Sequence, residues 1–149
     1  MNRARGRPTA GGAAREQRAA AARRALDALA PLGPVESRAM FGGHGVYLEG
    51  AMLALVAGGE VYLKVDDVNR ERFVAAGLPP FVHVARGREI TMSFHRAPEP
   101  LDDWGALAPF AESALLAARR ALAARAARRR AGSAGHHRDP RAGPGASAG

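Results

Sequence analysis

The chain has 149 residues, which is enough for one domain with tails. It contains no cysteine, which excludes disulfides and thiolate metal sites, and no apolar run approaches the ~20 residues of a membrane span. The N-terminal segment carries charge without an apolar stretch behind it, so we expect a cytoplasmic protein rather than a secreted one.

The net charge of +8 is concentrated at the two ends of the chain. Residues 1–24 carry seven arginines and one acid, and residues 119–149 carry eight arginines and one acid. Residues 25–118 carry seven basic residues against twelve acidic ones, so the middle is mildly acidic. Basic ends can bind nucleic acid without sequence preference, but a composition that favours arginine would also enrich it in solvated tails.

The first half of the chain predicts one helix and then a meander of strands. Residues 1–13 lack large apolar side chains and are expected to be disordered. A helix is predicted from Ala14 to about Leu32, where prolines and a glycine end it. Strands are predicted at 46–49, 51–56 and 61–65, and the short glycine turns between them predict antiparallel pairing.

The second half predicts a short helix, two strands and a long helix. The short helix begins near Asp66 or Asp67, which can cap it, and ends at Gly77. Strands are predicted at 81–84 and 90–95, and apolar residues at helical spacing from 104 to 122 predict the last helix. Residues 126–149 are expected to form a disordered tail, which leaves one domain over 14–125.

The predicted order is therefore α-β-β-β-α-β-β-α, an α+β fold with an antiparallel sheet of about five strands.

The segment "MFGGHGVYLEG", residues 40–50, contains a G-x-x-G pattern that could cradle a phosphate. Its context is wrong for that role, because a strand follows it and neither a dinucleotide fingerprint nor a G-K-[ST] triplet is present. We interpret the glycines as a bend or bulge where the backbone needs a positive φ or a close approach. His44 is expected to be a surface residue in this turn.

Nothing in the sequence predicts an enzyme, a cofactor or a metal. The histidines lack ligand-like spacing, the serines lack a nucleophile elbow, and the paired carboxylates Asp102 and Asp103 suit helix capping. Lys64, the only lysine, lies in a predicted strand beside Asp66. It is either an exposed strand lysine or part of a small-ligand site.

The C-terminal helix ends in an arginine-rich stretch that could contact phosphates. The candidate side chains are Arg119, Arg120, Arg125, Arg128, Arg129 and Arg130. They spread around the helix, and no aromatic residue alternates with them for base stacking. We expect deletion of residues 119–149 to abolish any DNA retention while the domain still folds.

Three segments in order, "RAMFGGHGVYLEGAMLALVAGGEVYLKVD", "NRERFVAAGLPPF" and "ITMSFHRAPE", resemble the N-terminal domain of TfoX/Sxy-type competence regulators. The resemblance covers roughly residues 20–120. Its main motif positions, structural or interacting, are Arg38, Met40, Phe41, Gly42, Gly43, Gly45, Tyr47, Tyr62, Lys64, Met92, Ser93 and Phe94. Further matching positions are Asn69, Phe73, Gly77, Phe81 and Pro98.

The resemblance implies an α+β fold similar to secretion-chaperone-like domains and a regulatory, non-enzymatic role. Family members act as co-regulators beside a CRP-type activator at competence promoters. Many carry a second, helical C-terminal domain, whereas this sequence has an arginine-rich helix end and a tail, which implies a stand-alone member. The expected partner is a transcription-factor-like protein, contacted through a sheet face or edge that includes Tyr62 and Lys64.

Two alternatives remain open. The first is a nucleic-acid-binding protein that uses its arginine-rich ends, and the second is a small-ligand binder or enzyme around Lys64 and Asp66.

Overall fold

The computed structural model describes residues 10–40 and 42–137. Its elements are α1 (Ala10–Leu29), a 3-10 turn η1 (Ala30–Leu32), β1 (Glu36–Met40), β2 (Gly43–Leu48), β3 (Ala51–Ala57), β4 (Glu60–Lys64), α2 (Arg70–Ala75), β5 (Pro80–Ala85), β6 (Arg88–Arg96) and α3 (Trp104–His137). All strands pair antiparallel in one sheet of order β1-β2-β3-β4-β6-β5. The α+β class and the antiparallel sheet are confirmed.

The sheet has six strands in this structure, one more than the sequence predicted. The additional strand, β1, reads Glu-Ser-Arg-Ala-Met and shows no clean alternation, because it is an edge strand that pairs only with β2. Strand β2 also begins earlier than predicted, at Gly43 rather than Val46. Of the glycines interpreted as a bend or bulge, Gly43 and Gly45 lie inside β2, where Gly43 makes the expected close backbone approach, and Gly42 before it has the expected positive φ.

Three hairpins close on two-residue turns in which both residues have positive φ. The turns are Glu49–Gly50 between β2 and β3, Gly58–Gly59 between β3 and β4, and Arg86–Gly87 between β5 and β6. Turns of this kind match the right-handed twist of the flanking strands, and glycine adopts the required φ without strain. Local sequence thus sets the meander.

Helices α1 and α3 pack on one face of the sheet and bury its side chains. Val46, Leu53 and Leu63 are fully buried there, together with Ala25 and Leu29 of α1 and Leu107, Ala111 and Ala114 of α3. Phe73 of α2 closes the core at one end, with its ring 5.1 Å from that of Phe110. We call this side of the sheet the covered face.

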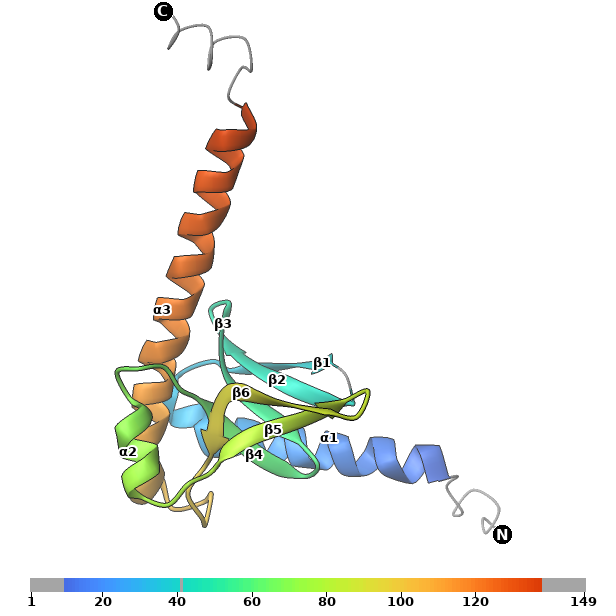
Figure 1. Cartoon of the computed structure of the whole chain (residues 1–149). Helices are drawn as coiled ribbons and strands as arrows, with labels where there is room; N and C mark the ends of the chain where they lie inside the picture. Colours follow the sequence, from blue (N-terminus) through green and yellow to red (C-terminus); the bar gives the residue numbers. More distant parts are fainter. Residues whose placement is uncertain (1–9, 41, 138–149) are drawn as a thin grey trace, which may run out of the picture.

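Helix α3 extends well beyond the sheet, as Figure 1 shows. Its first half crosses the strand ends, and its second half projects away from the rest of the described chain. From Ala123 to Ser133 every side chain except that of Ala126 is exposed. Residues 126–137 are helical here, whereas the sequence had suggested a disordered tail, and α1 begins at Ala10 rather than Ala14.

The remainder of the expected tails, residues 1–9 and 138–149, lies outside the described residues. Within the described part, no helix is both long enough and apolar enough to cross a membrane.

Candidate functional site

The face of the sheet opposite the helices, which we call the open face, carries a different set of side chains. Cross-strand partners point to the same side of a sheet, so the register identifies its members. The pairs Arg38–Gly45, Gly45–Leu55, Leu55–Tyr62, Tyr47–Met52 and Lys64–Phe94 lie on it. Met40, Phe81, His83 and Met92 line a hollow with several of these residues.

A β-bulge in β3 decides which of its residues reach the open face. Val46 pairs with Ala54 but Tyr47 pairs with Met52, so Leu53 is an extra residue without its own partner. The bulge shifts the alternation by one residue. Leu53 and Ala54 both enter the core, while Met52 and Leu55 lie on the open face. Met52 and Leu55 are three residues apart, whereas residues on one face of a regular strand are an even number apart. The alternation of the sequence therefore does not predict that they share a face.

Gly43 and Gly45 form the floor of the open face. A Cβ added at Gly43 would collide with the carbonyl oxygen of Val56, so only glycine permits this approach of β2 to β3. A Cβ at Gly45 would lie 3.0 Å from the ends of Met52 and Tyr47 and 3.1 Å from Met40 Sδ. Those side chains occupy the space that the missing Cβ leaves, which gives the G-G-x-G pattern a packing role.

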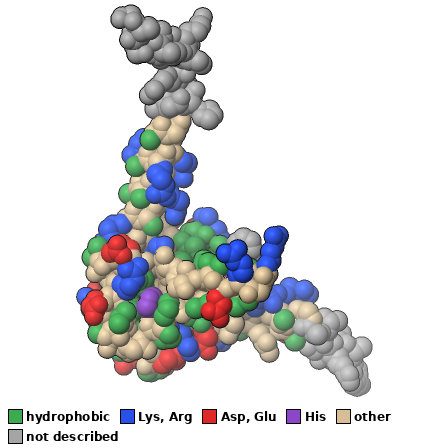
Figure 2. Space-filling view, in the orientation of Figure 1, with side chains coloured by type: hydrophobic (Ala, Val, Ile, Leu, Met, Phe, Trp, Pro, Cys, Tyr) green, Lys and Arg blue, Asp and Glu red, His purple; other side chains and the backbone are tan. Residues whose placement is uncertain are grey.

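An apolar groove of about 340 Å³ runs over this floor. Its walls are Met40, Met52, Leu55, Phe81, Met92 and Phe94. The rings of Tyr62 and Phe81 lie 4.8 Å apart beside it, and the side chain of Met92 is 37% exposed. Figure 2 shows hydrophobic side chains gathered over the sheet beside the base of α3, whose projecting half carries basic side chains. Exposed apolar surface of this kind is typical of protein interaction sites.

Lys64 lies at the end of this face, where α3 passes the strand ends. Its Nζ is 5.0 Å from the centroid of the Phe94 ring, a cation–π contact. A second hollow, of about 310 Å³, is lined by Lys64, Tyr47, Met52, Phe94 and Arg125. Burial, and next the charge of Arg125, lower the pKa of Lys64, and Asp66 opposes this in part. Lys64 is thus half-buried rather than an exposed strand lysine.

A polar network beside Lys64 joins β4, α2 and α3. Asp66 accepts two hydrogen bonds from Arg120, at 2.7 and 3.0 Å, and another from the backbone N–H of Val68. These donors, the Arg120 guanidinium first among them, lower the pKa of Asp66. Buried Asn69 donates to the carbonyl of Lys64 and to Ser113 Oγ. The network holds α3 against the end of β4, so its role is structural.

Most motif positions predicted from the sequence converge on the open face. Nine of them lie there: Arg38, Met40, Gly43, Gly45, Tyr47, Tyr62, Lys64, Met92 and Phe94. The guanidinium of Arg38 stacks 4.4 Å above the ring of Tyr47. Gly42 sits before β2 with φ +78°, and Ser93 points to the opposite side of β6. Phe41 lies outside the described residues.

The arginines predicted to contact nucleic acid divide into two groups. Arg119 pairs with Glu49 at 3.6 Å and Arg120 binds Asp66, so both are attached to the body of the domain. Arg125, Arg128, Arg129 and Arg130 are exposed on α3. Among the residues described, no carboxylate forms an ion pair with these four.

The sequence predicted that His44 is a surface residue in a turn, and this prediction is wrong. It lies in β2 on the covered face, opposite Val56, and its Nδ1 is buried without a hydrogen-bond partner in the described chain. His95 is buried, with its Nδ1 2.7 Å from the carbonyl oxygen of Leu78. No group of three or more metal-ligating side chains occurs within residues 10–40 and 42–137.

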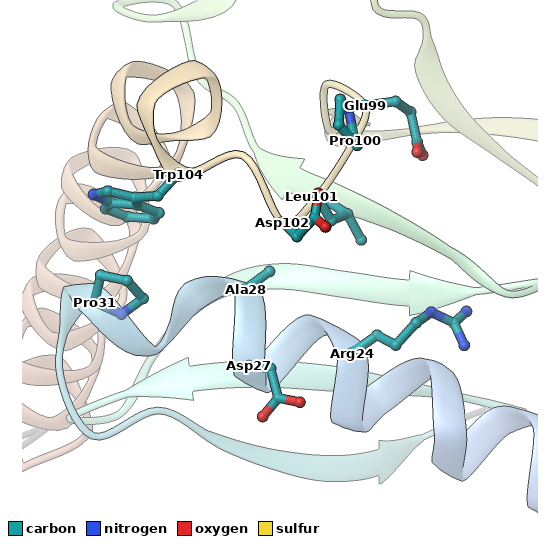
Figure 3. Close-up of a pocket in the computed structure, with 9 residues that line it drawn as sticks. All are labelled: Arg24, Asp27, Ala28, Pro31, Glu99, Pro100, Leu101, Asp102 and Trp104. Carbon is teal, nitrogen blue, oxygen red and sulfur yellow. The ribbon is translucent and has the colours of Figure 1, made fainter.

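Another hollow, of about 640 Å³, lies between the end of α1 and the loop before α3. Arg24, Asp27, Glu99, Asp102 and Trp104 are among its lining residues. Figure 3 shows that the three carboxylates point in different directions and do not converge on one point. We therefore take the open face, and not this hollow, as the candidate site.

Comparison with known proteins identifies the family. The family model of the TfoX N-terminal domain matches residues 27–118, which include the whole sheet and α3 as far as Ala118. The comparison with curated proteins returned no match.

Proposed function

Because the chain belongs to the TfoX N-terminal domain family, we propose that it is a regulatory, non-catalytic domain that binds a protein partner through the open face. The observation that carries the proposal is the convergence of the motif residues on one uncovered sheet face, around an apolar groove. In its finer form, the partner is a transcription factor and the process is competence. That form rests on the sequence resemblance alone.

The chemistry of the groove favours a protein over a small polar substrate. Most of the side chains that line it are methionine, aliphatic and phenylalanine side chains, with one histidine, His83. Methionine is flexible and polarizable, so it adapts to the side chains of a partner. The groove contains no nucleophile paired with a base, and this suits recognition better than catalysis.

The test compares two variants that each place a charge on an exposed apolar position. Met92→Asp alters the open face, and Leu116→Asp alters the outer side of α3, where the side chain is 53% exposed. Full-length protein is used to capture partners, which are identified by mass spectrometry and retested as purified proteins. We expect the specific partner to be lost with Met92→Asp and kept with Leu116→Asp.

Two outcomes contradict this proposal. One is equal binding of the purified partner by both variants. The other is self-association of the wild-type chain that Met92→Asp abolishes, which would assign the open face to a second copy.

Nucleic-acid binding is a second candidate, favoured by the four exposed arginines on the projecting half of α3. Three of them, Arg128, Arg129 and Arg130, follow Arg125 on the part of α3 that projects from the body, where a duplex can approach them. Deletion of residues 119–149 is an unsuitable test, contrary to the sequence-based expectation, because Arg120 binds Asp66 and Leu122 packs against the core.

Charge-removing substitutions test this candidate without disturbing the core. The triple variant Arg128→Gln, Arg129→Gln, Arg130→Gln is compared with a control that removes three body arginines, Arg72, Arg86 and Arg88. If α3 contacts DNA, the slope of log binding constant against log salt falls by about 0.9 for each lost phosphate contact in the first variant only. If the salt dependence of DNA binding has the same slope for both variants, α3 is not the element that contacts DNA.

A further inference from the structure

Two cations from distant parts of the sequence meet at the corner between the open face and α3. Lys64 ends β4, Arg125 lies in the projecting half of α3, and both line the same hollow of about 310 Å³. At this separation the charge of Arg125 lowers the pKa of Lys64. Like charges held together in a partly buried site cost free energy unless a counter-charge offsets them.

The described chain supplies no free counter-charge at this corner. The charge of Asp66 raises the pKa of Lys64 in part, but both carboxylate oxygens of Asp66 already accept hydrogen bonds from Arg120. Neither Lys64 nor Arg125 forms an ion pair with any residue that the structure describes. The corner is therefore a dicationic site with room for an anion.

The corner is continuous with the apolar groove, because Met52 and Phe94 line both hollows. A ligand that fills both must place an anionic group a short distance from apolar groups. A nucleic-acid backbone presents phosphates without such apolar neighbours and suits the exposed outer arginines better. An extended polypeptide alternates its side chains at a spacing that can satisfy both parts.

We propose that Lys64 and Arg125 form an anion site that binds the carboxylate of an acidic residue in the protein partner, while the neighbouring apolar residues of that partner lie in the groove. This inference rests on the proposed function and assigns the chemistry of the partner segment. Arg125 offers a planar pair of donors for the carboxylate, and Lys64 offers a compact charge beside the Phe94 ring.

The experiment uses the fact that Lys64 is the only lysine of the chain. Full-length protein labelled with ¹³C at the lysine Cε gives one side-chain signal, and its pH titration yields the pKa of Lys64 directly. The probe is the N-acetylated tripeptide amide Leu-Glu-Leu, and the control is the same peptide with Gln in place of Glu. We expect the Glu peptide to raise the pKa of Lys64 toward its ordinary value and the Gln peptide to leave it unchanged.

Matched variants separate Arg125 from its neighbours on α3. Arg125→Gln removes one pair of hydrogen-bond donors. We expect it to lower the affinity for the Glu peptide by roughly tenfold, the size expected of one charge-assisted hydrogen-bonded contact. It also raises the pKa of Lys64 without peptide, because the charge of Arg125 lowers that pKa. Arg128→Gln, one turn further from the body, leaves both quantities unchanged.

The proposal is overturned if the Glu and Gln peptides shift the pKa of Lys64 equally, or if the Arg125→Gln protein binds the Glu peptide as tightly as wild type does. If inorganic phosphate raises the pKa of Lys64 more than the Glu peptide does at equal concentration, the assignment of a carboxylate ligand is overturned. Failure of the proposed function is distinguishable, because the partner test with Met92→Asp does not involve Lys64 or Arg125. The Glu peptide can still raise the pKa of Lys64 even if that partner test fails.

Discussion

The two faces of the sheet are built by the same strands but have opposite properties. On the covered face, Val46, Leu53 and Leu63 have 0% of their surface exposed and pack beneath two helices. On the open face, Tyr47, Met52 and Tyr62 are only partly buried, and α3 reaches them just at one corner. The difference separates the residues that stabilise the domain from those available to bind a partner.

The composition of the two faces follows from this separation. A covered face favours small and aliphatic side chains that pack at high density. The open face carries methionine, aromatic rings and charged groups, which keep contact with water while offering apolar area. The first prediction compares one residue of each face, and the later ones change the floor of the open face and the corner where α3 meets it.

The largest effect is expected for Leu53→Ala, compared with Leu55→Ala two residues along the same strand. Leu53 is fully buried in the core, so its truncation should cost about 3 kcal/mol of unfolding free energy. Leu55 lies on the open face, so its truncation should lower the unfolding free energy by about 1 kcal/mol or less. Urea denaturation measures both, and equal losses would show that the bulge does not divide β3 in this way.

The next effect concerns the two glycines of the floor. Gly43→Ala forces a methyl group against the backbone of β3 and should cost about 2 kcal/mol. Gly45→Ala meets side-chain atoms of Met52, Tyr47 and Met40 rather than backbone, and these side chains are only partly buried and can shift, so stability should change by less than about 1 kcal/mol. Thermal unfolding checks both expectations. Partner binding of the Gly45→Ala protein should fall although the variant stays folded, because the added methyl group reshapes the groove floor.

A smaller effect is expected for Asp66→Asn, which removes a charge from the network that holds α3. The pair with Arg120 is partly exposed, so the loss at neutral pH should be about 1 kcal/mol. Because folding lowers the pKa of Asp66, its contribution is present above the unfolded-state pKa and is lost as pH falls through the folded-state pKa. The difference between variant and wild type should therefore vanish in strong acid, as denaturation measured at several pH values will show.

The smallest stability effect is expected for Lys64→Met. Folding lowers the pKa of Lys64, so its charged form does not favour the native state and its removal should change stability by less than about 0.5 kcal/mol. Partner binding should fall despite this. A strongly destabilised Lys64→Met protein, in the same denaturation assay, would place the lysine among the structural residues instead.

Much of the fold was predictable because it depends on local chemistry. The hairpin turns, the end of α2 at Gly77 and the last helix follow from glycine conformations and helical spacing. The motif residues were also found, through the family resemblance. Met52 and Leu55 were missed, since the bulge breaks the period of two on which strand analysis depends.

The sequence by itself determined the order of helices and strands, the antiparallel meander and the separation of a mildly acidic body from basic ends. These properties depend on residues that are neighbours in the chain. Only the tertiary structure decided that β1 completes the sheet, that one face stays open, and that Lys64 meets Arg125 while Arg120 occupies Asp66. The physical reason is that these contacts join residues far apart in the chain, through strand pairing for β1 and through the packing of α3 for Lys64 and Asp66, which no local pattern encodes.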